Sequence, residues 1–298
     1  MRLSACGMND KMAKLKIRLL ARDSKMPNIA IMKVSAYWKA LGADVDWYDP
    51  IFDNRDTDIL YESQLFDFTE PYCYYPENAD IYAGGTGINI EGRLPVEIDS
   101  VTDLDYSIYP DHLYSMQLYS RGCIRNCPFC VVRRKEGYIY PVKPMKLNPN
   151  GEHIEILDNN FFANPQWRDA YSDIIDTGLP VKLHGVDARI IDEEQADALN
   201  PMRMVGRIHI AWDFPQVDMI PKLTEITKLI KPYKLTCYVL IGYDSTPEQD
   251  LYRVESLRSL GIDPFVMPYN KDDLYQRRFA RWVNMKAVFK SVRWEDYK

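Results

Sequence analysis

The chain has 298 residues, of which 46% are hydrophobic and 27% charged, and its formal net charge is −6 at pH 7. This length and composition predict a globular protein with one large core or, following usual domain sizes, two modest ones. No run of about 18 apolar residues occurs, and Lys and Arg interrupt the N-terminus, so we expect no membrane-spanning helix and no signal peptide. We therefore expect a cytoplasmic protein with no membrane partner.

Charge is spread unevenly along the sequence. Residues 41–110 carry 16 Asp and Glu against two Arg, whereas residues 1–40 carry nine Lys and Arg against two Asp. The acidic stretch would repel a phosphate backbone, which argues against a broad nucleic-acid surface in the first half. The run from Arg277 to Lys298 is basic and aromatic; we interpret it as a closing amphipathic helix, with RNA contact as the alternative.

The first part of the chain reads as a small α/β unit. Residues 15–21 form an apolar strand pattern, residues 27–42 have apolar positions at helical spacing, and residues 43–49 alternate like a second strand. A further strand runs into the glycine-rich turn of residues 79–89. A linker rich in Asp, Ser and Pro, residues 97–111, predicts the boundary of a first domain.

Strand and helix patterns then alternate about every 30 residues. The predicted strands are 114–120, 153–159, 181–187, 206–213, 234–242 and 263–269. The predicted helices are 166–177, 192–199, 217–230, 247–260 and 272–290. Six β/α repeats are too few for a closed eight-stranded barrel and predict an open partial barrel, with functional groups at the carboxyl ends of its strands.

Three of the six cysteines lie in the stretch RGCIRNCPFCVVRRKEG, at Cys123, Cys127 and Cys130, directly after the first strand of that barrel. In a reducing compartment such a cluster is metal-binding or catalytic rather than a disulfide framework. Structural zinc normally takes four protein ligands, and no second close pair exists; zinc and ordinary buried thiols stay open as alternatives. A cubane iron–sulfur cluster held by three thiolates would leave one iron open, and the surrounding Arg and Lys would favour thiolates.

The pattern Cys123-x3-Cys127-x2-Cys130, with Phe129 before the last cysteine, resembles the signature of the radical S-adenosylmethionine (radical SAM) enzymes. The resemblance implies a [4Fe-4S] cluster whose open iron binds S-adenosylmethionine, with Phe129 near the cofactor. It also implies reductive cleavage to a 5′-deoxyadenosyl radical that abstracts hydrogen from the substrate. An electron-donating protein such as flavodoxin or ferredoxin would be a partner.

The next two predicted strands end in segments that resemble cofactor-binding motifs of that superfamily. ILDNNFF places Asp158, Asn159 and Asn160 where many members hold the methionine amino group, although it departs from the commoner Gly-Gly-Glu form. HGVDARIID resembles the third-strand motif, which implies contacts of Asp187 with ribose and of Arg189 with the carboxylate.

The last three predicted strands extend the resemblance. Asp213 ends the fourth strand, Gly242 lies in a glycine motif near adenine after the fifth, and the backbone around Met267 would meet adenine from the sixth. For each polar residue among these candidates, a role in capping a strand end or a helix stays open.

The two domains together resemble the branch that joins a cobalamin-binding-type Rossmann-like domain to a radical SAM barrel. We expect the Rossmann-like domain at 1–105, with an extension before Met12 that we expect to be disordered, and a partial (β/α)6 TIM-type barrel with a C-terminal helix at 106–298. The cobalamin motif Asp-x-His-x-x-Gly is absent and no histidine precedes His112, so we expect no cobalamin. Binding without a histidine ligand stays open, because YAGGTG (82–87) resembles the glycine strand near the nucleotide tail.

The sequence thus predicts a radical SAM enzyme acting on a small molecule or peptide, with RNA as a further possibility. A tRNA methylthiotransferase-like enzyme is one alternative, but such enzymes carry a second three-cysteine cluster and an RNA-binding module. The dispersed Cys6, Cys73 and Cys237 predict no second cluster. A non-catalytic iron–sulfur or other metal-binding module is the alternative from a different class.

Overall fold

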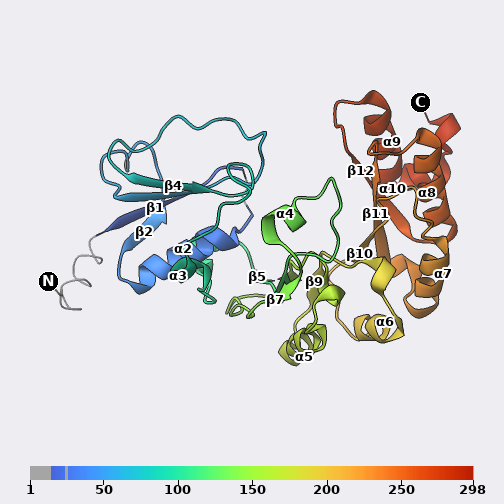
Figure 1. Ribbon diagram of the computed structural model, residues 1–298, viewed down its shortest axis with the longest axis horizontal. Coiled ribbons are helices and arrows are strands. Elements are labelled where there is room, and N and C mark those ends of the chain that lie inside the picture. The colour runs from blue at the N-terminus through green and yellow to red at the C-terminus, as the bar shows by residue number, and fades with distance from the viewer. Residues whose placement is uncertain (1–14, 24–25, 298) are drawn as a thin grey trace. The chain divides into compact units, whose positions relative to one another are not determined.

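The computed structural model describes residues 15–23 and 26–297 (Figure 1). The expected extension before Met12, with Cys6, lies outside the described residues. The described chain forms two compact units: an N-terminal unit, up to Met116 with Arg125–Gly137 and Lys143–Glu152, and a C-terminal unit of the remaining residues. No helix within the described part of the chain is long and apolar enough to cross a membrane.

The N-terminal unit is built on a four-stranded parallel sheet. Its strands are Lys16–Ala21 (β1), Asp44–Trp47 (β2), Ile59–Ser63 (β3) and Asp80–Gly84 (β4), in the order β2-β1-β3-β4. Helix α2, Ile29–Ala40, begins at Asn28, whose side chain accepts hydrogen bonds from two backbone amides of the first turn. The predicted β-α-β start is therefore confirmed.

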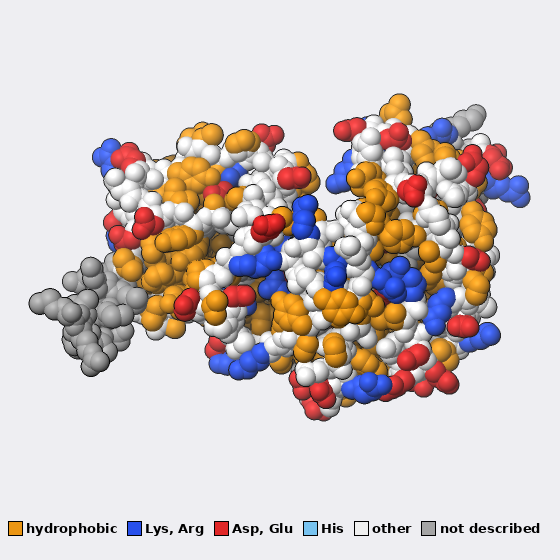
Figure 2. All heavy atoms as spheres, viewed as in Figure 1, with side chains coloured by type: hydrophobic (Ala, Val, Ile, Leu, Met, Phe, Trp, Pro, Cys, Tyr) orange, Lys and Arg blue, Asp and Glu red, His pale blue; other side chains and the backbone are white. Residues whose placement is uncertain are grey.

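The core of this sheet forms where α2 packs on β1. Ile17 and Leu19 of β1 and Ile31 and Val34 of α2 belong to one buried apolar cluster, which Tyr61 of β3 joins. Figure 1 shows α2 and the short helix α3, Val96–Asp99, on the same side of the sheet. Figure 2 shows apolar side chains gathered on the surface of this unit. Ile81 and Tyr82 of β4 are exposed.

Strand β3 is absent from the sequence prediction, and it contains an acidic residue. Glu62 is nevertheless buried, and its carboxylate pairs with the guanidinium of Arg22 at 2.8 Å. The hydroxyl of Tyr75 donates to its second oxygen, also at 2.8 Å. These contacts compensate the burial of a charge that sequence patterning assigns to a surface or loop.

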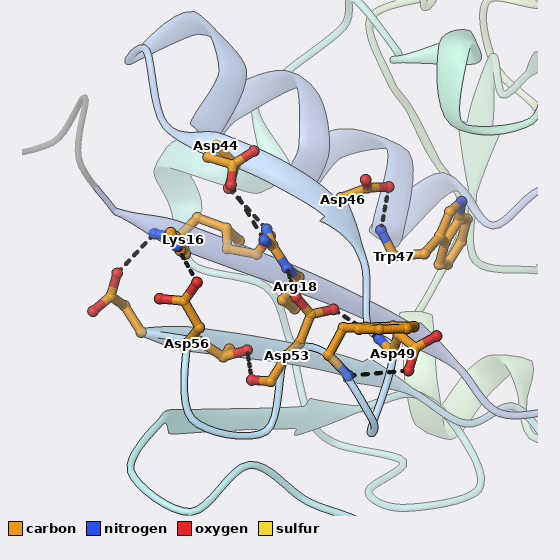
Figure 3. A network of polar contacts seen from close by, with 12 residues as sticks. Lys16, Arg18, Asp44, Asp46, Trp47, Asp49, Asp53 and Asp56 are labelled. Atoms are coloured by element: carbon orange, nitrogen blue, oxygen red, sulfur yellow. Dashed lines mark hydrogen bonds and ion pairs between the residues drawn. The ribbon is translucent and has the colours of Figure 1, made fainter.

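A polar network holds the first strand to the loop after β2 (Figure 3). Arg18 is only 7% exposed, and its guanidinium contacts Asp53 at 2.9 Å and Asp44 at 3.2 Å. Lys16, the first residue of the same strand, pairs with Asp56. The acidic excess of this region therefore serves in part to neutralise buried and half-buried cations of β1.

The glycine-rich turn after β4 packs against the protein's own backbone. A Cβ on Gly85 would lie 2.2 Å from the carbonyl oxygen of Gln64, and one on Gly87 would lie 2.4 Å from that of Phe66. Gly85 also has a φ of +98°, which favours glycine. Close packing of two loops thus explains this motif without a ligand.

Two short helical segments lie inside the predicted linker 97–111. They are the end of α3 and the 3-10 turn Tyr106–Ile108 (η1), whose cap Asp105 accepts a hydrogen bond from the Ser107 amide. The short helix α4, Val132–Glu136, follows the cysteine loop and also belongs to the N-terminal unit. The expected boundary at residue 105 lies eleven residues before Met116, where the first segment of this unit ends.

The C-terminal unit contains the predicted β/α repeats. Its sheets are β5-β8-β9, β10-β11-β12 and the two-residue antiparallel pair β6-β7. The strands are Tyr114–Gln117 (β5, of which only Gln117 belongs to this unit), Ser120–Arg121 (β6), Tyr140–Pro141 (β7), His153–Ile156 (β8), Val181–Leu183 (β9), Ile208–Ala211 (β10), Leu235–Ile241 (β11) and Asp263–Pro268 (β12). The α-helices are Trp167–Thr177 (α5), Glu193–Leu199 (α6), Ile220–Leu229 (α7), Pro247–Ser259 (α8), Leu274–Asn284 (α9) and Lys286–Ser291 (α10).

The α/β class with parallel strands is therefore confirmed, whereas the described residues form no barrel. Strands β8 and β9 pair in parallel, as do β10, β11 and β12, but only the isolated bridge Val181–Met204 extends the first sheet beyond β9. Figure 1 shows α7 and α8 on one side of the second sheet. The six predicted strands are thus divided between two three-stranded sheets.

The predicted helix 272–290 is two helices in the structure. It breaks at Met285, which ends α9 and precedes α10 with a non-helical ψ of 83°. The side chain of Asn284 explains the break, because it bonds the backbone nitrogen and oxygen of Val266 in β12, at 2.8 and 3.0 Å. The helix terminus is therefore tied to the neighbouring strand.

Candidate functional site

The cysteine loop follows β6 and has no helix or strand between Gly122 and Val131. Cys123 and Cys127 are half-buried and Cys130 is exposed, and none of the three forms a disulfide. The amide of Cys130 donates to the carbonyl of Cys127 at 3.0 Å, which closes a tight turn between them. Phe129, inside that turn, is half-buried.

The three thiols belong to both compact units. Across residues 15–23 and 26–297, no group of three or more His, Cys, Asp or Glu side chains lies so that it could hold a metal ion. The division between the two compact units passes through the loop, with Cys123 in the C-terminal unit and Cys127 and Cys130 in the N-terminal one.

Asp158, after β8, fixes the backbone that leads into the cysteine loop. Its carboxylate accepts from the amide of Tyr119 at 2.8 Å and from the hydroxyl of Ser120, and it is 1% exposed. Burial raises the pKa of Asp158 to about 6, although these hydrogen bonds oppose the rise. Asn164 holds the same segment by donating to the Tyr119 carbonyl at 3.2 Å.

The neighbouring Asn160 is buried in a different way. It is 1% exposed, and its side-chain oxygen receives no hydrogen bond from any residue that the structure describes. Asn159 is exposed beside it. A buried amide oxygen without a donor is costly, so the side chain of Asn160 is suited to accept a hydrogen bond from a ligand.

Gly185 brings the ends of β8 and β9 together. A Cβ at this position would lie 2.2 Å from the carbonyl oxygen of Asp158 and 2.6 Å from that of Asn159. The carbonyl of Gly185 accepts from the amide of Phe161 at 3.0 Å. The glycine in HGVD is therefore required by the close approach of two strand ends.

Asp187 and Arg189 form a local ion pair after β9. The Nε and Nη2 atoms of Arg189 contact the two carboxylate oxygens of Asp187 at 2.7 and 3.1 Å. Asp187 also accepts from the Arg189 amide, at 3.1 Å, as the cap of the 3-10 turn Ala188–Ile190 (η3). Part of the guanidinium fork expected to bind a cofactor carboxylate is thus occupied by Asp187.

A small pocket lies at the ends of β9 and β10. Arg189 and Asp213 contribute its charged groups, and Trp212, Val217 and Met219 contribute apolar wall. Burial raises the pKa of Asp213, while the amide of Leu240 and the charges of Arg253 and Arg189 oppose the rise. The structure therefore brings together the predicted site residues Asp187, Arg189 and Asp213.

Gly242 and Met267 occupy the ends of the last two strands. Gly242 has a φ of +75°, and its amide donates to the hydroxyl of Ser245 at 3.0 Å. A Cβ on Gly242 would lie 2.1 Å from the amide end of the Gln276 side chain, and the left-handed backbone is the feature that favours glycine here. Met267 pairs with Leu240 in register and is half-buried.

Sequence reasoning missed a group of side chains on β8 and β9. His153, Glu155, Lys182 and His184 form a contiguous set of polar contacts. The four histidines are widely spaced in the sequence. The pattern that indicates this cluster is a pair of charged or imidazole residues at alternate positions in each of two successive predicted strands, because alternate residues share one face of a strand.

Comparison with known proteins adds no assignment. No family model matches this chain, and no curated protein matches it in sequence.

Proposed function

We propose that the protein is a radical S-adenosylmethionine enzyme in which Cys123, Cys127 and Cys130 hold a [4Fe-4S] cluster. The observation that carries the proposal is the spacing of these three cysteines in the loop after the first strands of a β/α repeat unit. Three thiolates on a cubane leave one iron for a cofactor ligand. In this superfamily, the reduced cluster with S-adenosylmethionine bound supplies a 5′-deoxyadenosyl radical that abstracts hydrogen from a substrate.

The chemistry of the three side chains suits the cluster, since all three are free thiols that are half-buried or exposed. They belong to both compact units, with Cys123 in one and Cys127 and Cys130 in the other. The loop between Gly122 and Val131 contains no helix or strand. Ligand geometry would then form with binding, as is common where metal binding couples to folding.

The strand ends supply residues suited to S-adenosylmethionine. The buried, unsatisfied oxygen of Asn160 suits an ammonium donor, which supports its expected role at the methionine amino group. We assign the carboxylate of Asp158 to the loop backbone instead, because Tyr119 and Ser120 already donate to it. Arg189, with Asp187 and Asp213, would take the carboxylate and ribose.

Other expectations remain part of the proposal. Phe129, Gly242 and Met267 would surround adenine, and the two three-stranded sheets would be parts of one partial (β/α)6 barrel. The Rossmann-like domain would work without cobalamin. A flavodoxin or ferredoxin would reduce the cluster, and the substrate would be a small molecule or peptide, with RNA the third option.

The test is anaerobic reconstitution with iron and sulfide, followed by dithionite, S-adenosylmethionine and measurement of 5′-deoxyadenosine by mass spectrometry. We expect about four irons per chain and 5′-deoxyadenosine formation. Cys127→Ala should lose both while the β/α core stays folded. An iron chromophore without 5′-deoxyadenosine would indicate a non-catalytic iron–sulfur module, and bound zinc in its place would rule the proposal out.

Asn160→Leu tests the cofactor assignment separately. Removing the acceptor should weaken S-adenosylmethionine binding by roughly 1.5–3 kcal/mol if one charged hydrogen bond is lost, with the iron content unchanged. Equal affinity in the variant would remove Asn160 from the site.

A further inference from the structure

One face of the adjoining strands β8 and β9 carries a cluster of charged and imidazole side chains. Alternate residues of a strand share a face, and Glu155 lies opposite Lys182 in the parallel register. His153 is two residues before Glu155, and His184 is two residues after Lys182. The intervening side chains on the other face are at most 1% exposed: Ile154, Ile156, Val181 and Leu183.

Glu155 is the centre of this cluster. One carboxylate oxygen, Oε2, contacts Nε2 of His184 at 2.8 Å. The other, Oε1, lies 3.1 Å from Nζ of Lys182 and 3.4 Å from Nε2 of His153. The side chain of Glu155 is 10% exposed, whereas that of His184 is 35% exposed. The carboxylate is therefore enclosed and one imidazole is accessible.

Ionisation of Glu155 fixes the tautomer of His184. The hydrogen bond from His184 lowers the pKa of Glu155 to about 2, with Lys182 and His153 adding to the effect and burial opposing it. An ionised carboxylate only accepts hydrogen bonds, so Nε2 of His184 must carry the proton. Nδ1 of the neutral ring then presents a lone pair, and no hydrogen bond from the described residues reaches it.

Aromatic rings continue this face across the next strands. The ring of His184 lies 6.4 Å from that of His209 on β10, and the ring of His209 lies 5.2 Å from that of Tyr238 on β11. Tyr238 meets Phe265 of β12 edge to face at 5.5 Å, and Phe265 is 42% exposed. Burial lowers the pKa of His209, and coulombic effects of His184 and Lys182 add to this, which disfavours the charged form of its ring. Beyond His209, the wall consists of the aromatic side chains of Tyr238 and Phe265.

We propose that His184 is a general base positioned by Glu155, and that it takes a proton from a hydroxyl or ammonium group of a small organic substrate lying along these rings. The O–H or N–H bond breaks, its electron pair stays on the substrate atom, and the proton binds Nδ1. The carboxylate of Glu155 stabilises the resulting imidazolium, as in carboxylate–histidine pairs generally. Lys182 keeps Glu155 ionised, so that the carboxylate remains an acceptor for Nε2.

This inference goes beyond the proposed radical chemistry and does not depend on it. The residues lie on or directly after strands of the C-terminal unit, whereas Cys127 and Cys130 belong to the N-terminal unit. A metal role for the cluster is not supported, because no three His, Cys, Asp or Glu side chains within the described ranges could hold an ion. An accessible imidazole on an enclosed carboxylate is suited to acid–base chemistry.

The first test is the tautomer of His184 in the wild-type chain. The protein has four histidines, so nitrogen-15 labelling of histidine gives few signals, and His184→Gln assigns the one in question. Correlation spectra at about pH 8, where an ordinary imidazole is neutral, should show the proton on Nε2. A proton on Nδ1 would overturn the proposal, because the lone pair would then face Glu155.

The second test measures the reactivity of the imidazole. Diethyl pyrocarbonate should modify the imidazole of His184. Glu155→Gln should slow this modification about tenfold, because the substitution removes the carboxylate charge that contacts Nε2 of the ring. His153→Gln is the matched control in the same cluster and should change the rate by about twofold or less, because its contact is long and partly exposed. Peptide mass spectrometry gives the rate at each histidine.

Equal rates in the wild type and Glu155→Gln would overturn the positioning role, and so would an equally large effect of His153→Gln. A urea unfolding curve checks that Glu155→Gln is folded. Should that variant fail to fold, the wild-type tautomer still decides the proposal. Loss of the iron–sulfur cluster in Cys127→Ala should leave both measurements unchanged, which separates this test from that of the proposed function.

Discussion

Replacing Arg253 with Met removes the cation from an ion pair in which both side chains are 1% exposed. Nη2 of Arg253 contacts Asp250 at 2.6 Å, and Nη1 donates to the carbonyl of Trp212 at 2.9 Å. The hydroxyl of Tyr275 still donates to Asp250, at 3.1 Å, in the variant. The variant therefore keeps a buried carboxylate on Asp250 that has lost its cation. It also leaves the buried carbonyl of Trp212 without this donor.

The expected cost to the free energy of unfolding is about 3–5 kcal/mol, the usual result of breaking a buried pair by removing one partner. Because Trp212 and Asp213 line the pocket with Arg189, the same change should loosen that pocket. Replacing both partners, Asp250→Leu with Arg253→Met, should recover about 1–4 kcal/mol, since no charge is then left buried.

Urea unfolding followed by far-ultraviolet circular dichroism measures these differences. Lys222→Met is the matched control: Lys222 and Glu225 have the same i,i+3 spacing on a helix but are 31% and 67% exposed, so the cost should be below about 1 kcal/mol. The reasoning fails if Arg253→Met costs no more than this control, or if the double variant is as unstable as the single one.

Asp158 should make wild-type stability fall by about 3 kcal/mol as the pH rises from about 4 to about 6, because its folded pKa lies above the ordinary value; Asp158→Asn should abolish that slope in unfolding curves. Glu155 acts in the opposite direction: its lowered pKa contributes stability above about pH 4.5 that is lost towards pH 2, and Glu155→Gln should remove this acid-side loss. Gly185→Ala should cost more than about 2 kcal/mol in chemical denaturation, because its Cβ meets backbone oxygen, whereas Gly84→Ala meets nothing within 4 Å and should cost less than about 1 kcal/mol. Arg18→Ala should lower the unfolding free energy by about 1.5–3 kcal/mol, because the half-buried carboxylate of Asp53 loses its cation and keeps only the amide of Asp49 as a donor; a change within about 0.5 kcal/mol would show that the pair is not stabilising.

Hydrophobic periodicity predicted the regular elements closely. Helix 247–260 was expected and spans Pro247–Ser259, and strand 234–242 was expected and spans Leu235–Ile241. Such segments are dominated by local spacing, caps and glycine or proline at their ends. The start of this helix is an example, because Thr246 and Gln249, three residues apart, form a capping box that can be recognised from the local sequence alone.

Features that depend on tertiary partners were not predictable in the same way. Strand β3 contains Glu62, whose burial depends on Arg22, 40 residues away. The break at Met285 depends on Asn284 reaching β12, and the Glu155 cluster depends on the register of two strands. In each case the deciding contact joins residues that no local pattern connects.

In the candidate site too, the positions of residues along the chain were predictable from the sequence, whereas their side-chain contacts were not. The sequence predicted that Asp187, Arg189 and Asp213 follow the carboxyl ends of successive strands, where ligands bind in parallel α/β folds. It did not predict that Asp187 would occupy the fork of Arg189, or that Asp158 would hold the start of the cysteine loop. Side-chain pairing at strand ends is set by turns that the strand pattern does not describe.

The spectrum of the reduced, reconstituted protein tests the central claim most directly. Electron paramagnetic resonance of the dithionite-reduced chain should show an iron–sulfur signal that changes when S-adenosylmethionine is added, since one iron is left for that ligand. An iron–sulfur signal that stays the same on addition, or a protein that binds zinc and gives no such signal, would contradict the account.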